Sequence, residues 1–448
     1  MCHSGRPSAT GPCASKATGR PSYGSCASTP EHSPPGGDAG KSSGRSTSHA
    51  GPAAKYRGVV GNPLQTLSLA DLRRRTSEKW RRYPPDVLPL WVAEMDVPLA
   101  EPVARALTDA VALGDTGYPP DGTDYASALA GFARERWGWA PKVEQTRLVP
   151  DVMLGVVEMV KLVTGYGDAV VINPPVYPPF YDFLRSNERR VVEAPLNAEY
   201  RLDPDALERA FAEAVDGGRS AAYLLCSPHN PTGTVHTADE LTMVIELSDR
   251  YGVRVVVDEI HAPLIYPGVT FRPYLSMPGG ERGLALHSAS KAWNLAGVKA
   301  ALAVAGPAAA DDLARLPKVA GDGASHLGAL AHTAAFRYGG GWLDELLAGL
   351  DQNRRLLGDL LAEHLPQVRY RPPEGTYLTW LDCRDLPLPV DGSGAPADPA
   401  EVFLERGRVA LVSGPLFGTG GAGHARFNLA TSPEVVTEAV RRMAAALR

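Results

Sequence analysis

Residues 221–261 alternate two apolar runs with a helical pattern, and this alternation decides the fold. The run Ala221-Ala-Tyr-Leu-Leu-Cys226 predicts a buried strand that ends at the turn Ser227-Pro-His-Asn-Pro-Thr-Gly233. A helical pattern follows over Ala238–Tyr251, and Val253-Arg-Val-Val-Val257 is the next apolar run. Two strands joined through a helix in this way are typical of a parallel pair in an α/β sheet.

The same alternation extends outward from this segment. Further apolar runs predict strands at Asp168–Ile172, Leu284–His287 and Ala300–Ala305, and helical patterns cover Glu101–Leu113 and Asp205–Val215. We therefore predict an α/β fold in which a large domain holds a mainly parallel sheet with helices on both faces.

The C-terminal part of the chain has a different pattern. One long helix is predicted over Trp342–Leu365, short strands at Tyr377–Leu381 and Ala410–Val412, and a last helix at Pro433–Leu447. This order is typical of a smaller α+β domain. We expect residues 98–335 to form the large domain, and residues 55–97 to join residues 336–448 in the small domain.

Composition sets the N-terminus apart from this pattern. Residues 1–50 contain 25 Ser, Gly and Pro residues and no Ile, Leu, Val, Phe or Trp. Such a segment buries too little apolar surface to offset the entropy of ordering, so residues 1–54 are predicted to be a disordered tail. Three of the five cysteines lie there without CxxC spacing, while Cys226 and Cys383 lie in apolar runs, so neither a zinc site nor a disulfide framework is expected.

Charge and hydropathy narrow the class of protein. The net charge of −5 argues against a nucleic-acid-binding protein, which usually carries a basic excess. No run of about 18 apolar residues predicts a membrane-spanning helix. A cytoplasmic protein with a small-molecule substrate is the expectation.

Several polar side chains follow the predicted strands, where ligands bind in open α/β sheets. They are Tyr177, Asn230, Asp258, His261 and Lys291. Lys291 is either an ordinary solvated charge or a desolvated amine able to form a Schiff base. Asp258 is either a helix N-cap or the partner of a buried cation such as a pyridinium nitrogen. Asn230 and His261 are each compatible with a purely structural role.

One glycine-rich motif suggests a dinucleotide-binding site instead. Gly418-Thr-Gly-Gly-Ala-Gly423 fits GxGxxG, but a dinucleotide site needs this loop to open a helix. The residues from His424 onward predict a strand, so we interpret the motif as a glycine loop before Arg426.

Several motifs, taken in their order along the chain, resemble those of a known enzyme family. Asn230-Pro-Thr-Gly233, Asp258, Ser-x-Ser-Lys291 and Ala425-Arg-Phe-Asn428 together resemble the fold-type I pyridoxal-phosphate enzymes of the aminotransferase class I/II superfamily, over about residues 55–448. Within it, the chain is similar to the bacterial cystathionine β-lyase-like carbon–sulfur lyases. That branch is indicated by Leu88-Pro-Leu-Trp-Val-Ala-Glu-Met-Asp96, Asp258-Glu-Ile-His261 and Ser288-Ala-Ser-Lys-Ala-Trp-Asn-Leu-Ala-Gly297.

The resemblance implies a pyridoxal 5'-phosphate cofactor and roles around its ring. Lys291 would carry the cofactor and move the α-proton of the substrate. Asp258 would pair with the pyridine nitrogen, Asn230 would bind the phenolic oxygen, and Tyr177 would stack on the ring. His261 stands where aminotransferases often have Tyr, which favours the lyase branch.

The cofactor phosphate would be held by a second group. Val152 and Met153 match the loop whose backbone N–H groups face it at a helix start. Ser288 would add a hydroxyl, and Lys299 stands where many members have Arg. Tyr118 matches the tyrosine that reaches the phosphate of a neighbouring subunit, which implies a homodimer.

The substrate would be held by Arg426, which resembles the arginine that grips the α-carboxylate, with Trp91 and Asn230 nearby. Glu94 stands where the lyase branch often has Asp. The favoured function is β-elimination of a cysteine-type thioether such as cystathionine, giving a thiol, pyruvate and ammonia. Transamination, which shares the early steps, is the alternative, and a bifunctional regulator that binds a transcription factor is a second one.

Overall fold

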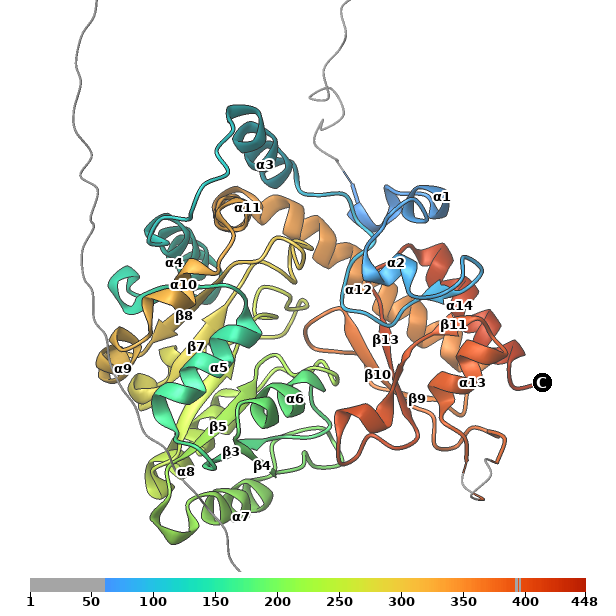
Figure 1. Ribbon diagram of the computed structural model, residues 1–448. Coiled ribbons are helices and arrows are strands. Elements are labelled where there is room, and N and C mark those ends of the chain that lie inside the picture. Colours follow the sequence, from blue (N-terminus) through green and yellow to red (C-terminus); the bar gives the residue numbers. More distant parts are fainter. Residues whose placement is uncertain (1–60, 391–393, 395) are drawn as a thin grey trace, which may run out of the picture. The chain divides into compact units, whose positions relative to one another are not determined.

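The computed structural model describes residues 61–390, 394 and 396–448 (Figure 1). The predicted tail, residues 1–54, lies outside the described residues. No helix in the described ranges is long and apolar enough to cross a membrane.

A seven-stranded sheet organises the first part of the chain, drawn in green to yellow in Figure 1. Its strand order is β2 (Thr146–Val149), β8 (Ala301–Ala305), β7 (Leu284–His287), β6 (Arg254–Asp258), β5 (Ala221–Cys226), β3 (Ala169–Ile172) and β4 (Arg190–Glu193). Neighbouring strands from β7 to β4 run parallel, whereas β8 runs antiparallel to both of its neighbours. The mainly parallel sheet is therefore confirmed.

Both faces of this sheet are buried because alternate side chains of each strand enter different cores. Tyr223 and Leu225 pack with helices α7 (Pro204–Ala214) and α8 (Ala238–Tyr251). Ala222 and Leu224 pack with α5 (Val152–Val163) and α6 (Pro179–Ser186). The period of two in a strand explains why β5 is a continuous apolar run and does not alternate with polar residues.

Local signals define the ends of these elements. Helix α8 begins at a capping box formed by Thr237 and Glu240 and ends at Gly252, whose φ of 69° is left-handed. Strand β5, strand β7, helix α8 and helix α3 (Glu101–Leu113) have the predicted bounds. Apart from α12 (Gly340–His364) and α14 (Pro433–Ala445), the remaining α-helices are α1 (Leu69–Leu72), α2 (Glu78–Arg81), α4 (Thr123–Trp137), α9 (Ala310–Ala314), α10 (Lys318–Asp322), α11 (His326–Tyr338) and α13 (Pro399–Glu405).

The C-terminal part holds a four-stranded sheet in the order β12 (Val412–Ser413), β13 (His424–Asn428), β10 (Leu378–Asp382) and β9 (Arg369–Tyr370). Helices α12 (Gly340–His364) and α14 (Pro433–Ala445) pack against each other beside it (Figure 1). The glycine motif 418–423 precedes the strand β13, as expected, and opens no helix.

The predicted strand Ala410–Val412 is wrong as a single element. Residues Val409–Ala410 form β11, which pairs in parallel with β1 (Leu88–Pro89), whereas β12 belongs to the four-stranded sheet. Leu411, which is 6% exposed, lies between the two strands and fills the core at the change of sheet. The pairing of β1 with β11 also brings residues near Leu88 beside the C-terminal part. The division into a large and a small domain stays a prediction.

Candidate active site

A cavity of about 260 Å³ lies where the carboxyl ends of β5 and β6 meet the start of α5. Eight of the predicted residues line it: Val152, Met153, Tyr177, Asn230, Asp258, His261, Lys291 and Lys299. They come from separate segments that the parallel sheet brings to one edge. For this reason, residues that directly follow predicted strands were good candidates for the site.

The start of α5 forms the anion-binding end of this cavity. Asp151 caps the helix by accepting a hydrogen bond from the Leu154 N–H at 2.8 Å, while the N–H groups of Val152 and Met153 have no acceptor among the described residues. Free N–H groups and the helix dipole favour a negatively charged group here. Lys299 adds a positive charge and forms an ion pair with Asp151.

Lys291 is half-buried, and its ammonium form is destabilised. Burial and, to a smaller extent, the charge of Arg426 lower its pKa from 10.5 to about 8. Its amine donates a hydrogen bond to the carbonyl of Ala93 at 3.2 Å. About a tenth of the amine is therefore unprotonated at pH 7, far more than for a lysine of ordinary pKa, and this is the form that acts as a nucleophile or general base.

Asp258 is the last residue of β6 and is 4% exposed. It caps no helix, because a turn follows the strand, and its carboxylate accepts a hydrogen bond from the Ile260 N–H at 3.0 Å. Burial raises its pKa from 3.8 to about 6. No basic side chain in the described ranges lies within 4 Å of it, so the N-cap interpretation is wrong and a cationic partner is still missing.

His261 lines the same cavity from the turn after β6. Its Nδ1 forms a hydrogen bond with the hydroxyl of Thr376 at 2.9 Å. Burial, with smaller contributions from the charges of Lys291 and Arg426, lowers the pKa of His261 well below 6.5. The ring is therefore neutral in the physiological range, so it provides a hydrogen-bonding group without a charge.

Arg426, on β13, brings a buried guanidinium to Asn230. It donates to the side-chain oxygen of Asn230 at 3.0 Å and to the carbonyl of Trp91 at 2.8 Å. The guanidinium carbon lies 5.3 Å from the ring centre of Phe417. Arg426 is 5% exposed, and in the part of the chain that the structure describes no carboxylate lies within 4 Å of it. Burial lowers its pKa from 12.5 to about 10, so the group stays charged and lacks an anion.

The Asn230 turn is held in place by a close approach of two chain segments. Gly233 has a left-handed φ of 71°, and a Cβ there would lie 2.3 Å from Cβ of Pro373. Only glycine fits both conditions. The turn that carries Asn230 is thus packed against the segment leading to β10, which pairs with the strand of Arg426.

Four predicted residues do not line the cavity. Arg426 is connected to it only through its hydrogen bond to Asn230. The hydroxyl of Ser288 donates to the carbonyl of Ala300 at 2.8 Å, which turns it away from the cavity. Trp91 contributes its carbonyl to Arg426, and its ring packs edge-to-face on Tyr83. Tyr118 is 93% exposed. Their roles toward cofactor and substrate stay predictions.

The sequence reasoning missed other lining residues, among them Asp151, Cys226, Ile260 and Ser290. Ser290 was quoted only as part of the Ser-x-Ser-Lys291 motif, and its hydroxyl lies 2.9 Å from that of Ser288. Ser290 is therefore the serine of this motif that faces the cavity. An Asp at a helix start, such as Asp151, carries no signal that distinguishes it from an ordinary cap.

The residues present fit pyridoxal 5'-phosphate. The free N–H groups at the start of α5, with Lys299 and Ser290, suit the phosphate. The buried Asp258, which lacks a cation, suits the protonated pyridine nitrogen, and the Lys291 amine suits the aldehyde carbon.

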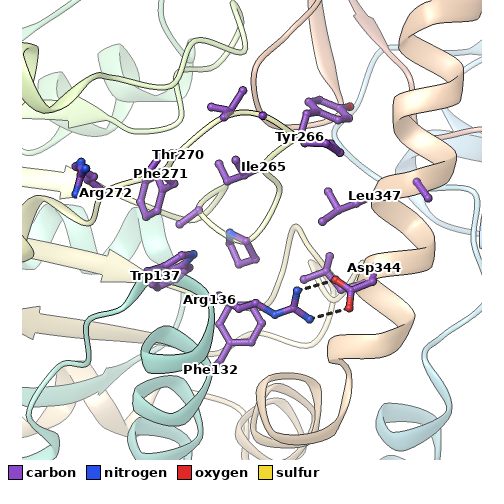
Figure 2. Close-up of a pocket in the computed structure, with 17 residues that line it drawn as sticks. Phe132, Arg136, Trp137, Ile265, Tyr266, Thr270, Phe271, Arg272, Asp344 and Leu347 are labelled. Carbon is purple, nitrogen blue, oxygen red and sulfur yellow. Dashed lines mark hydrogen bonds and ion pairs between the residues drawn. The ribbon is translucent and has the colours of Figure 1, made fainter.

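A second, larger cavity of about 510 Å³ lies between α4, α12 and the loop 262–272. Figure 2 shows the guanidinium of Arg136 pointing at the carboxylate of Asp344, with bonds of 2.7 and 2.9 Å. Aromatic rings of Phe132, Trp137 and Phe271 line the remainder. None of the predicted site residues lines this cavity.

The chain is similar to several known proteins. The family described as aminotransferase class I and II matches residues 102–443. A Mycobacterium tuberculosis protein whose name refers to cystathionine beta-lyase is 57% identical over 404 residues, covering 87% of this chain and 99% of its own. Cystathionine beta-lyase of Corynebacterium glutamicum is 35% identical, covering 85% of this chain and 99% of its own. The crystal structure of cystalysin from Treponema denticola, which contains pyridoxal 5'-phosphate, has a TM-score of 0.78 and 26% identity, covering 87% and 99% of the two chains.

Proposed function

Because this chain belongs to the aminotransferase class I and II family, we propose that it is a pyridoxal-phosphate-dependent carbon–sulfur lyase. Its substrates would be cysteine-type thioethers such as cystathionine, each cleaved with one molecule of water to a thiol, pyruvate and ammonia. The observation that carries this proposal is that a half-buried amine of lowered pKa, Lys291, lies within the electrostatic influence of a buried guanidinium without a carboxylate partner among the described residues, Arg426. The names of the relatives at 57% and 35% identity support the lyase.

The residues of this chain would divide the chemistry as follows. Pyridoxal phosphate, when bound, supplies an electron sink for negative charge at the substrate α-carbon. Arg426 binds the α-carboxylate, for which its planar guanidinium allows two parallel hydrogen bonds. The Lys291 amine takes the α-proton as a general base. The carbon–sulfur bond then breaks at Cβ, and the thiolate leaves.

Asp258 and Asn230 would position these groups. Asp258, with a pKa of about 6, is mostly ionised at neutral pH and would keep a proton on the pyridine nitrogen. The Asn230 side chain already holds the guanidinium of Arg426, so it would orient cofactor and substrate together. Transamination needs the same residues up to removal of the α-proton, and it remains the alternative.

A paired assay tests the proposal. The purified holoenzyme should release pyruvate and a thiol from cystathionine, measured with a lactate dehydrogenase couple and a thiol reagent. The same sample, given an amino acid and a keto acid, should form little new amino acid. Formation of a new amino acid without any pyruvate from cystathionine would establish the aminotransferase in place of the lyase. The regulator hypothesis and the cytoplasmic location stay predictions from the sequence.

A homodimer is also part of the proposal. Tyr118 is 93% exposed, and Val111 and Leu113, on the preceding helix α3, are 61% and 81% exposed. Large exposed apolar side chains close together are typical of an interaction surface. If Tyr118 serves the partner's site, Lys291→Ala and Tyr118→Ala subunits should each be inactive alone. Mixing them should restore about a quarter of the sites, because half of the dimers would then carry one intact site.

A further inference from the structure

A third cavity, of about 710 Å³, adjoins the Lys291 cavity. One wall is the segment 74–78, and the opposite wall is the loop 294–298 that follows Lys291. Ala296 lines both cavities. Glu94 lines the third cavity, and its neighbour Ala93 lines the Lys291 cavity and accepts the hydrogen bond of the Lys291 amine. A substrate held at Lys291 could therefore extend into this space.

Glu94 supplies a carboxylate that the fold itself does not neutralise. The residue is half-buried, and no basic side chain of the described residues lies within 4 Å of its carboxylate. Its backbone carbonyl is occupied by Lys79 and Asn428, which fixes the position of the residue. Its negative charge raises the pKa of Lys291, so the carboxylate lies close enough to act on the reacting amine.

A positively charged side chain and a hydroxyl without a hydrogen-bond partner also line the third cavity. Arg74 is 84% exposed and has only a 3.8 Å contact with Asp71. The hydroxyl of Ser77 is buried without a hydrogen-bond partner in the described part of the chain. By contrast, Arg75 is occupied by the carbonyls of Met95 and Val97. Glu94, Arg74 and Ser77 are thus an anion, a cation and a hydroxyl that the fold leaves available, and the exposed Thr76 and Glu78 also line this cavity.

We propose that this cavity binds the distal end of a thioether substrate that carries a second amino-acid group, as cystathionine does. Glu94 takes the distal ammonium, while Arg74 and Ser77 take the distal carboxylate. The inference rests on the proposed lyase function and adds the residues that would select thioethers whose leaving thiol is itself an amino acid. S-Methylcysteine shares the reacting end with cystathionine and lacks the distal group, so it is the matched probe.

The test compares both substrates on the holoenzyme. Glu94→Gln should lower kcat/KM for cystathionine about tenfold or more, mainly through KM, because one charge pair is lost. The variant also changes the charge near Lys291 for both substrates, so the readout is the ratio of kcat/KM for cystathionine to kcat/KM for S-methylcysteine, which should fall about tenfold. Arg74→Gln should have the same selectivity with a smaller effect, since this side chain is exposed. Glu94→Asp keeps the charge and should retain most of the preference for cystathionine.

Arg73→Gln is the matched control, because Arg73 is exposed and lines neither of the two cavities. If Glu94→Gln lowers kcat/KM by the same factor for both substrates, then Glu94 acts only through Lys291. That result would overturn the proposal. An unchanged preference for cystathionine in both Glu94→Gln and Arg74→Gln would overturn it too. A wild-type enzyme that releases no pyruvate from either substrate would overturn the lyase function itself, a separate result. Arg74→Gln alters an exposed residue, so it keeps the test decisive if Glu94→Gln folds poorly.

Discussion

The cavities at Lys291 and at Arg136 differ in whether their charged side chains have partners, and the size of each cavity does not reflect this difference. The cavity at Arg136 is about twice as large, 510 against 260 Å³, and its charged pair is complete: Arg136 makes two bonds to Asp344. At the Lys291 cavity the charges lack partners: Asp258 lines it, and Arg426 is connected to it through Asn230. Asp258 and Arg426 are buried, and neither has an oppositely charged side chain within 4 Å among the described residues.

This difference indicates which of the two cavities carries out the reaction. A buried charge without a partner costs stability, so a fold retains it only when a ligand or a reaction uses it. The larger cavity has no such requirement, because Arg136 is paired with Asp344 and Arg272, which also lines it, is exposed to solvent. We therefore expect changes in the Lys291 cavity to lower activity with little loss of stability, and changes in the Arg136 cavity to do the reverse.

The largest effect should come from Lys291→Ala. The variant loses both the amine that holds the cofactor and the general base, so lyase activity should fall by about a thousandfold or more. The absorbance band of the bound cofactor near the visible edge should also disappear, while the circular dichroism spectrum stays as in the wild type. A variant that keeps both the band and the activity would contradict the assignment of Lys291.

Arg426→Gln should lower kcat/KM about a hundredfold, mainly through KM, because the substrate carboxylate loses its charged partner. Its stability should not fall in proportion. The substitution removes a buried unpaired charge while Gln can still bond to Asn230 or to the Trp91 carbonyl, so the free energy of unfolding should change by less than about 1 kcal/mol. Urea unfolding measures this. A large loss of stability would show that Arg426 is a structural residue.

The pH dependence of cofactor uptake tests the electrostatics of the same cavity. The pKa of Lys291 is lowered to about 8, so protonation suppresses the free amine below that value and leaves it constant above. In cofactor-free protein, the rate of uptake of pyridoxal phosphate should rise about tenfold per pH unit below pH 8 and then level off. Stopped-flow absorbance records this rate. A continued rise toward pH 10 would indicate an exposed lysine with an ordinary pKa.

Much of this arrangement was predictable because its signals are local. Strand β5 is an apolar run that ends in a turn, and helix α8 has a capping box and a glycine end, so both were predicted to the residue. Asn230, Asp258 and Lys291 follow apolar runs, and the topology of a parallel sheet brings such positions to one edge.

The remainder depends on contacts between distant segments. The split at Leu411 occurs because β11 pairs with β1, and no local pattern near residue 410 encodes that partner. Ser288 and Ser290 look alike in the sequence, and only the carbonyl of Ala300 on the far side of Ser288 decides which of them faces the cavity. The unpaired state of Arg426 is likewise visible only once every neighbouring carboxylate has been located.

The smallest effect should come from the Arg136 cavity, and it completes the comparison. The side chains of Arg136 and Asp344 are 30% and 54% exposed, so their ion pair should contribute only about 0.2–1 kcal/mol. Arg136→Gln and Asp344→Asn should each lower the free energy of unfolding by that amount, and a double-mutant cycle isolates the pair itself. Cleavage of cystathionine should stay within about twofold of the wild type in both variants, because the pair touches no group of the Lys291 cavity. A loss of activity that exceeds the loss of stability would show that the larger cavity takes part in the reaction, and unpaired charge would then no longer distinguish the two.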